Sequence, residues 1–238
     1  YTDDIAMSPS EAAEFALYVH ENLDELVANG LDFTDDEWDA LISMYDAEIK
    51  YTDDCVGRLF DYVQALNGET VFIVTADHGE LFGERGVLAH KLLLDDALTN
   101  VPLVVHGLEA IHHQTDELVQ HGDLMQTLVA QASGDTSQFQ GVDLRSESRE
   151  FAISQCGPNR GALENFSEIN PEFDWSPYHA GTLTALRTSE FKLQWSDRED
   201  GRTELFELPD EETNVSDEYP ELTDDLQSKL HNWLRTEG

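Results

Sequence analysis

One short segment, residues 70–76, constrains the fold of this 238-residue chain more than any other. It reads Thr-Val-Phe-Ile-Val-Thr-Ala, which is β-branched and apolar and lacks the alternation of a half-exposed strand. Such a run predicts a short strand buried on both faces, as in a parallel sheet. Helical patterns lie before and after this strand, and a second short strand follows it. The order helix, strand, loop, strand, helix predicts an α/β layer architecture. The elements expected here are helices over 8–28, 34–66 and 124–132 and a strand over 101–105.

The pattern of predicted secondary structure changes after about residue 145. Residues 156–181 are rich in Gly, Pro, Asn and Ser and predict a long loop. Short strands separated by turn signals predict a small antiparallel sheet, and an amphipathic helix closes the chain. The strands are expected at 150–153, 182–187, 191–195 and 203–208, and the helix at 219–234.

Acidic residues dominate the charge, with 50 Asp and Glu against 13 Lys and Arg and a formal net charge of −37. They are spread along the chain and interleaved with apolar periodicity, whereas a disordered tail or a docking patch would be blocky. We therefore expect a surface adapted to high salt, in the cytoplasm or outside the cell. The charge argues against nucleic acid as a partner because no basic stripe is present. No apolar run is long enough for a membrane span.

Asp77, His78 and Gly79 follow the predicted strand directly and carry the clearest chemical signal. Ligands of open parallel sheets bind beyond the carboxyl ends of strands. Neighbouring strand residues point to opposite faces, so both side chains reach one ion only where strand gives way to loop, and Gly79 permits that turn. A carboxylate and an imidazole then offer oxygen and nitrogen to a divalent cation. The alternative is that Asp77 caps a helix and His78 packs on the sheet.

Several segments in the same order resemble conserved blocks of the sulfatases, in the alkaline phosphatase superfamily. Each block is weak alone, but five in the same order carry weight. Residues 45–59 resemble the long helix before their metal-binding strand. The others are VFIVTADHGE (71–80) with GERG (83–86) for "SDHGE…GEHG", NVPLVV (100–105) for "RVPLII", DLMQTL (123–128) for "DLLPTL" followed by GVDL (141–144), and TELFELPDEETN (203–214) for "ELYDL..DP.E..N".

The resemblance implies an alkaline-phosphatase-like sheet flanked by helices, with a small C-terminal antiparallel sheet and a terminal helix. Residues 1–145 would be the C-terminal part of the catalytic domain, and 146–238 a C-terminal α+β subdomain. It implies a metal-dependent hydrolase of small-molecule or carbohydrate sulfate esters. Asp77 and His78 carry over as metal ligands, and Lys91 as the basic residue that contacts the sulfate. His90 is either a proton donor to the leaving oxygen or an ordinary loop histidine. The ion would be calcium, or manganese or zinc in a phosphoesterase.

The sequence departs from the family pattern at the nucleophile, which lies early in sulfatases within a C/S-x-P-x-R motif. Nothing before Asp77 matches it. Cys156-Gly157-Pro158-Asn159-Arg160 does match, but it follows the metal strand instead of preceding it, and we interpret it as a chance match. We therefore expect the N-terminal half of the domain to be absent and the isolated chain to be inactive. The alternatives are a phosphoesterase or phosphotransferase of the same superfamily and a non-catalytic acidic interaction module.

Weaker candidates complete the sequence-based predictions. His112 and His113, with His106 and His121 nearby, suggest a second metal site, but a surface loop fits their spacing better. The acidic pairs Asp53-Asp54 and Asp95-Asp96 are expected on the solvated surface. Tyr178 and His179 are candidates to line a substrate cleft, and Cys55 and Cys156 permit one disulfide without requiring it.

Overall fold

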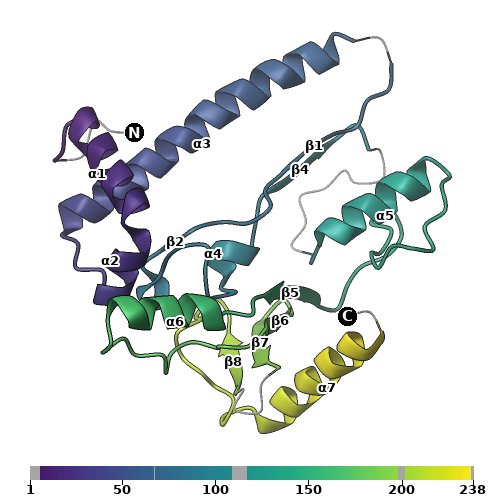
Figure 1. Cartoon of the computed structure of the whole chain (residues 1–238). Helices are drawn as coiled ribbons and strands as arrows, with labels where there is room; N and C mark the ends of the chain where they lie inside the picture. Colours follow the sequence, from purple (N-terminus) through teal and green to yellow (C-terminus); the bar gives the residue numbers. More distant parts are fainter. Residues whose placement is uncertain (1–5, 67, 109–116, 198–201, 237–238) are drawn as a thin grey trace. The chain divides into compact units, whose positions relative to one another are not determined.

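The structure, a computed structural model, describes residues 6–66, 68–108, 117–197 and 202–236 (Figure 1). The chain forms two compact units. The first contains Tyr1–Lys91, Pro102–Gly107 and Ala162–Asp174, and the second contains Leu92–Val101, Leu108–Gly161 and Trp175–Gly238.

The first unit begins with helices whose starts are capped by side chains. Its elements before the first strand are α1 (Pro9–Glu21), α2 (Leu23–Asn29) and α3 (Asp35–Gln64). Ser8 and Glu11 form a capping box at α1, and Thr34 and Glu37 form one at α3, so orphan N–H groups are paired. The single helix predicted over 8–28 is wrong in one respect. It breaks at Asn22, whose side-chain amide donates to the Tyr18 carbonyl at 2.7 Å and satisfies the end of α1.

α3 packs by only part of its length. Near its start, Ala40 is fully buried and Trp38 lies edge-on to Phe33, with ring centroids 5.0 Å apart. Farther along the helix, apolar side chains that recur at helical spacing are exposed, including Ile49 at 53% and Leu59 at 53%. The first turns of α3 are therefore held by apolar burial, while most of its later apolar stripe meets solvent in the chain as given.

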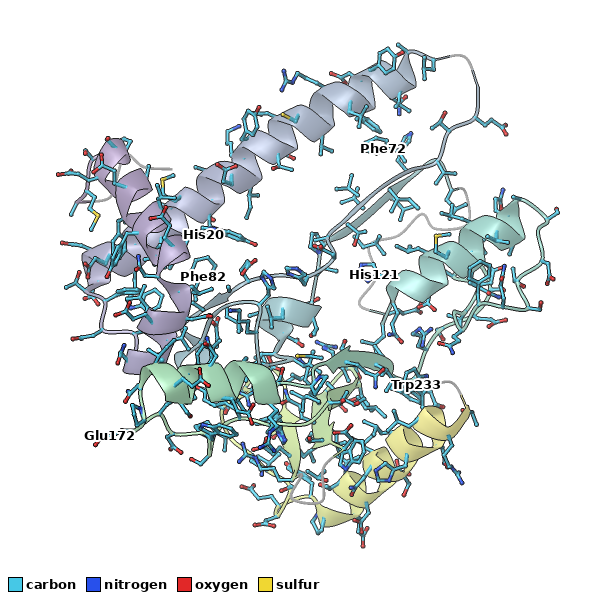
Figure 2. All side chains as sticks on the ribbon, in the orientation of Figure 1. His20, Phe72, Phe82, His121, Glu172 and Trp233 are labelled. Carbon is cyan, nitrogen blue, oxygen red and sulfur yellow. The ribbon has the colours of Figure 1, made fainter. Side chains whose placement is uncertain are left out.

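The strand predicted over 70–76 forms, but its surroundings differ from the prediction. β1 (Phe72–Thr75) pairs antiparallel with β4 (Leu103–His106) in a two-stranded sheet, not with a parallel neighbour. Its residues are half-buried or exposed rather than buried on both faces. Phe60 of α3 lies edge-on to Phe72, with centroids 5.2 Å apart, and covers one end of the pair (Figure 2 labels Phe72). An unbroken apolar run reports a tendency to be buried, but it does not report strand direction.

A small hairpin follows β1 and shapes the loop that carries the predicted site. β2 (Leu81–Phe82) and β3 (Leu88–Ala89) pair antiparallel, with Leu81 opposite Ala89. The short 3-10 helix Glu84–Gly86 joins them, and Gly83 before it has φ 107, a conformation that favours glycine. A side chain at Gly83 would also meet Trp38, because a Cβ there would lie 3.0 Å from the indole.

The second unit is built on a four-stranded antiparallel sheet in the order β5-β6-β7-β8. The sequence predicted these strands and the terminal helix, which packs on the sheet and brings Trp233 against its core (Figure 2). The strand bounds are β5 (Ala152–Cys156), β6 (Leu183–Arg187), β7 (Phe191–Ser196) and β8 (Thr203–Glu207). The helices are α4 (Asp96–Thr99), α5 (His121–Gln131) and α7 (Pro220–Thr236).

The loop predicted over 156–181 is partly wrong, because α6 (Arg160–Ile169) forms within it. Most of α6 belongs to the first unit. It buries Leu163 and Phe166, three residues apart on one helix face, and Phe166 lies edge-on to Phe173 with centroids 5.2 Å apart. Two apolar positions are too few to outweigh the Gly, Pro, Asn and Ser around them in a sequence pattern, although burial is enough to hold the helix.

The two acidic pairs expected on the surface behave differently. Asp53 and Asp54 are exposed, as predicted. The prediction for Asp95 and Asp96 is wrong, because Asp95 is only 3% exposed and Asp96 is ion-paired with Lys192 at 2.5 Å and with Arg187 at 2.9 Å. All four residues belong to the second unit. A buried ammonium there attracts carboxylates inward, which the composition of the chain did not suggest.

Within the described residues, no helix combines the length and the apolar character that crossing a membrane requires.

Candidate functional site

Asp77 and His78 lie just past the end of β1 and point toward a common position. The distance between Asp77 Oδ2 and His78 Nε2 is 3.8 Å. Backbone N–H groups of His78 and of Asp77 itself, with a further contribution from the nearby imidazoles, hold the pKa of the Asp77 carboxyl below its ordinary value. The carboxylate is 89% exposed and ionised at neutral pH. The pair therefore presents an oxygen and a nitrogen side by side, in reach of one cation.

The imidazole of His78 is oriented by its own backbone. Its Nδ1 lies 2.9 Å from the Gly79 carbonyl oxygen. A carbonyl only accepts hydrogen bonds, so Nδ1 carries the proton and Nε2 keeps its lone pair. This is the arrangement in which a second interaction fixes the tautomer of a metal-binding histidine.

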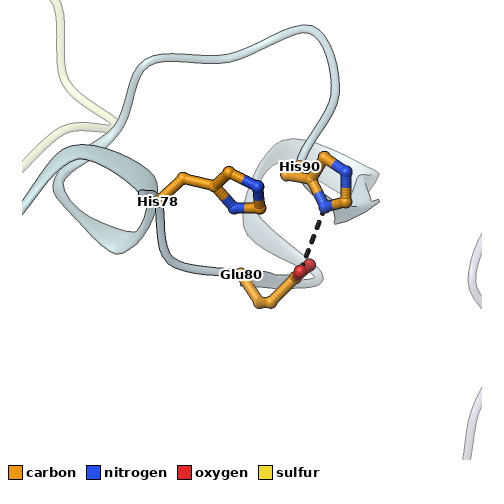
Figure 3. A group of neighbouring side chains, drawn as sticks. All are labelled: His78, Glu80 and His90. Carbon is orange, nitrogen blue, oxygen red and sulfur yellow. Dashed lines mark hydrogen bonds and ion pairs between the residues drawn. The ribbon is translucent and has the colours of Figure 1, made fainter. Parts of the chain in front are cut away.

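Two further side chains, Glu80 and His90, join His78 in a group that could hold a metal ion. The candidate ligand atoms of the three residues all lie within 4.8 Å of one another (Figure 3). His90 Nδ1 lies 3.0 Å from Glu80 Oε1, and the rings of His78 and His90 are 4.3 Å apart between centroids. The sequence singled out His78 and His90 but missed Glu80. Glu80 could have been found only from the register of the β2–β3 hairpin. Because Leu81 pairs with Ala89, the residues before and after that pair, Glu80 and His90, face each other.

The backbone around His90 and Lys91 is strained. Ala89 before them has φ 65 and Leu92 after them has φ 69. Left-handed backbone at non-glycine residues costs of order 1–3 kcal/mol each and persists only where surrounding structure holds it. Such strain concentrates at functional sites, and here it fixes the direction in which His90 and Lys91 leave the hairpin.

Lys91, the predicted sulfate-binding residue, is engaged by a partner that the sequence did not reveal. Its ammonium lies 2.6 Å from Asp24 Oδ1 at the start of α2. The other carboxylate oxygen of Asp24 accepts a hydrogen bond from the Asn165 amide at 3.0 Å. Both side chains of the pair are about two-fifths exposed, at 40% and 41%, so solvent reaches the ammonium. An incoming anion would bind the Lys91 ammonium together with the Asp24 carboxylate or in its place.

Cys156 does not have the environment of an activated nucleophile. It ends β5, and its thiol donates to the Asn159 side-chain oxygen at 3.4 Å. Burial raises the pKa of the Cys156 thiol, although the Asn159 contact acts in the opposite direction. A raised pKa lowers the thiolate fraction, which opposes nucleophilic attack. Cys55 and Cys156 are both free, so the disulfide that the sequence permitted is not formed.

Within the described residues, the side chain of His179 is buried and not open to a cleft, since it is 4% exposed and its Nε2 lies 2.8 Å from Glu204 Oε2. Burial alone would raise the pKa of Glu204, but hydrogen bonds and charge from His179 and Arg202 hold it below its ordinary value. His179 thus anchors the segment before β6 to β8, and Tyr178 beside it is half-buried. This corrects the cleft prediction for His179.

The four histidines considered for a second metal site cannot all be located, because two of them lie outside the described residues. His112 and His113 lie outside the described residues. His106 of β4 is bonded to Gln64 at 2.7 Å, and His121 begins α5 in the other unit.

Comparison with known proteins identifies the family of this chain. A family model described as Sulfatase matches residues 13–134, just over half of the chain. The chain belongs to the sulfatase family. Among curated relatives of this sulfatase-family chain, arylsulfatase K of Bos taurus is 28% identical over 213 residues, which are 84% of this chain and 38% of the relative. The sulfatase YidJ of Escherichia coli is 29% identical over 202 residues, 80% of this chain and 37% of that protein.

Solved sulfatase structures share the fold. The structure of BT4656 in complex with its substrate D-glucosamine-2-N,6-O-disulfate aligns with a TM-score of 0.68 and 18% identity, covering 94% of this chain and 46% of that one. BT1596, a 2-O GAG sulfatase, aligns with a TM-score of 0.70 and 16% identity, covering 92% and 48%. The predicted alkaline-phosphatase-like α/β fold with a small C-terminal antiparallel sheet is confirmed. This sulfatase-family chain spans about two-fifths of the length of its curated relatives, 38% for the bovine protein.

Proposed function

We propose that this chain is part of a metal-dependent sulfuric ester hydrolase that acts on small-molecule or carbohydrate sulfate esters. The observation that carries the proposal is the Asp77–His78 pair, 3.8 Å apart just past β1, within the segment that matches the sulfatase family. The family match supports the hydrolase, and the relative names and the substrate of BT4656 support sulfate esters as the substrate class.

The donor set fits a divalent cation. Asp77 contributes an ionised carboxylate, and His78 contributes an Nε2 lone pair because its Nδ1 faces the Gly79 carbonyl. Bound there, a cation would orient the nucleophile and offset negative charge on the ester oxygens. Calcium is the ion expected from the family resemblance, with manganese or zinc suited to the same donors.

Lys91 supplies the charge that would meet the substrate. Its ammonium is solvent-accessible, and in the chain as given Asp24 balances it. The sulfate group competes with Asp24 for the same hydrogen-bond donors, so Lys91 binds and orients the anionic end of the ester. His90 directly precedes Lys91, and its Nδ1 lies 3.0 Å from Glu80 Oε1. With Nδ1 directed at Glu80, His90 is the candidate to donate a proton to the leaving oxygen through Nε2.

The remaining catalytic groups would come from an N-terminal half of the same domain, followed by residues 1–145 as its C-terminal part and 146–238 as a C-terminal subdomain. The relatives are more than twice as long as the matched region. The exposed apolar side chains on α3 and β4, such as Leu59 at 53% and Val104 at 59%, offer a surface for it. We expect no activity from the 238-residue chain alone, and an assay of this chain with an aryl sulfate tests this directly.

The decisive assay compares sulfate and phosphate esters in the full-length protein. We expect Lys91→Ala to lower kcat/KM for an aryl sulfate at least about a hundredfold, the usual loss when one charge-stabilising donor is removed. Lys50→Ala, at an exposed lysine of the same unit paired with Asp54, serves as the matched control and should leave the rate unchanged. Faster hydrolysis of the phosphate ester would favour the phosphoesterase alternative. A metal-independent rate in both proteins would contradict the proposal.

The acidic surface is proposed to adapt the protein to a high-salt environment. At −37 the chain repels itself, and the Debye length falls to about 3 Å at 1 M salt, which screens exposed charges. We expect the melting temperature to rise by roughly 10 °C between 0.1 and 2 M KCl, equivalent to roughly 3 kcal/mol. Differential scanning fluorimetry across that range measures it. A melting temperature that stays flat or falls would contradict a halophilic surface.

A further inference from the structure

We propose that His78, Glu80 and His90 together bind one divalent first-row transition-metal ion that favours nitrogen ligands, such as zinc, iron or nickel, in preference to calcium. The inference rests on the proposed metal-dependent function and deepens it, because it adds two ligands to the Asp77–His78 pair and names the class of ion. It assigns His90 to the metal, which takes it out of the role of proton donor.

The donor atoms select the ion. Imidazole nitrogen suits zinc, iron, nickel and copper, whereas calcium takes six to eight oxygen ligands. Here two of the three side chains are imidazoles, and the third is a carboxylate. His78 keeps Nε2 free because Nδ1 is committed to the Gly79 carbonyl, 2.9 Å away. Asp77 Oδ2, at 3.8 Å from that Nε2, is placed to complete a mixed nitrogen and oxygen set.

The spacings match one ion after a small adjustment. His90 Nδ1 and Glu80 Oε1 are 3.0 Å apart, close to the separation of neighbouring ligands on an ion with bonds of about 2.1 Å. A metal ion there takes the place of the hydrogen that joins the pair. All three donor atoms lie within 4.8 Å, whereas two ligands of such an ion can be at most about 4.2 Å apart. Rotation of exposed side chains supplies the difference, since His90 is 53% and His78 is 41% exposed.

The hairpin prepares the site in the absence of metal. Leu81 pairs with Ala89, so Glu80 and His90 emerge opposite each other from the open end of the β2–β3 hairpin. Figure 3 shows the His78 ring directed toward His90, and the Glu80 carboxylate contacts the His90 ring from another side. Ala89 holds a left-handed backbone with φ 65 immediately before His90. The fold thus maintains a strained turn whose effect is to hold an imidazole against a carboxylate and a second imidazole.

Cobalt(II) is the probe that tests this site without any catalytic readout. Co²⁺ is titrated into the metal-free 238-residue chain, and visible absorption and calorimetry record the nitrogen-ligated complex and its affinity. We expect His90→Gln and Glu80→Gln each to weaken Co²⁺ binding at least about tenfold, as loss of a metal ligand or of its orienting partner does. His20→Gln is the matched control, at an exposed histidine of the same unit, and should leave the affinity unchanged. A hundredfold excess of Ca²⁺ should not displace the cobalt.

The same titration separates failure of this inference from failure of the proposed function. If Asp77→Asn and His78→Gln weaken binding while His90→Gln and Glu80→Gln do not, the metal pair of the proposed function stands and the three-residue site is overturned. Displacement of Co²⁺ by the Ca²⁺ excess overturns the choice of ion. If none of the four variants changes the affinity, both the site and the metal part of the proposed function fail. Circular dichroism of each metal-free variant establishes that it is folded.

Discussion

Replacing Lys192 by methionine should lower the free energy of unfolding of the second unit by about 3–5 kcal/mol, the cost of leaving buried carboxylates without their cation. The Lys192 side chain is 1% exposed, and its ammonium lies 2.5 Å from Asp96 and 2.5 Å from Glu211. It also donates to the Leu94 carbonyl at 3.0 Å. Methionine preserves the volume of the aliphatic stem but supplies no charge, so the loss is electrostatic rather than a packing defect.

The pH dependence identifies the charge as the cause. Burial raises the pKa of Glu211 above its ordinary value even though Lys192 acts to lower it. Without Lys192 that pKa rises further in the folded protein, so the native state of the variant binds a proton that the unfolded state gives up. The stability lost in Lys192→Met should therefore shrink as the pH falls from 7 to 5.

Urea denaturation at both pH values, followed by circular dichroism, measures the effect. Lys229→Met is the matched control, because Lys229 forms exposed ion pairs with Asp225 and Glu150 at 3.3 and 3.9 Å. Exposed pairs contribute little, so this variant should resemble the wild-type protein. Equal losses in the two variants, or a loss in Lys192→Met that is the same at pH 7 and pH 5, would contradict a buried-charge role.

This network illustrates which features escaped prediction from the sequence. Asp95 and Asp96 belong to a chain with 50 acidic residues, so the composition of the chain predicts that they lie on the surface. Asp96 pairs with Lys192 in β7, Asp95 accepts from Gln194 of the same strand, and the Lys192 contact to Leu94 joins residues 98 positions apart in the sequence. The Lys91–Asp24 ion pair is of the same kind, because its partners are 67 positions apart in the sequence. No local pattern encodes an ion pair between distant segments, because it forms only when tertiary packing brings them together.

Local features were predictable to the extent that neighbours in sequence decide them. Apolar periodicity predicted α3, and turn signals between short apolar runs predicted the strands of the C-terminal sheet. The proximity of Asp77 and His78 required only adjacency and a permissive glycine. Glu80 was missed because its place beside His90 depends on the register of a two-residue hairpin. The antiparallel pairing of β1 was missed because apolar runs of parallel and antiparallel strands look alike.

Asp123→Ala should destabilise the second unit by about 3–5 kcal/mol, because it removes the anionic partner of a largely buried guanidinium and the acceptor of four hydrogen bonds at once. The Asp123 side chain is fully buried at the start of α5. It accepts from the Gln120 and Val142 backbone N–H groups, each at 2.8 Å, and from the Arg149 guanidinium. These contacts hold the pKa of Asp123 below its ordinary value although burial acts to raise it.

The backbone around Asp123 shows why the carboxylate cannot be replaced by packing. A Cβ at Gly141 would lie 2.3 Å from the Gly122 carbonyl oxygen, so the loop before Val142 lies directly against the first turn of α5. The Val142 N–H and the Arg149 guanidinium, which meet there, donate to Asp123. Alanine leaves the Val142 N–H and the Arg149 guanidinium, whose side chain is 13% exposed, without an acceptor.

A double-mutant cycle separates the charge from the hydrogen bonds. If the uncompensated guanidinium accounts for much of the loss, adding Arg149→Met to Asp123→Ala should recover at least about 1 kcal/mol, since the two residues are directly coupled. Asp135→Ala, at an exposed aspartate that accepts from Ser137 in the loop after α5, is the control and should have a much smaller effect. Strictly additive losses in urea denaturation would show that Asp123 acts on the backbone of α5 and its loop independently of Arg149. In that case the helix start, rather than the ion pair, would be what holds residues 141–149 in place.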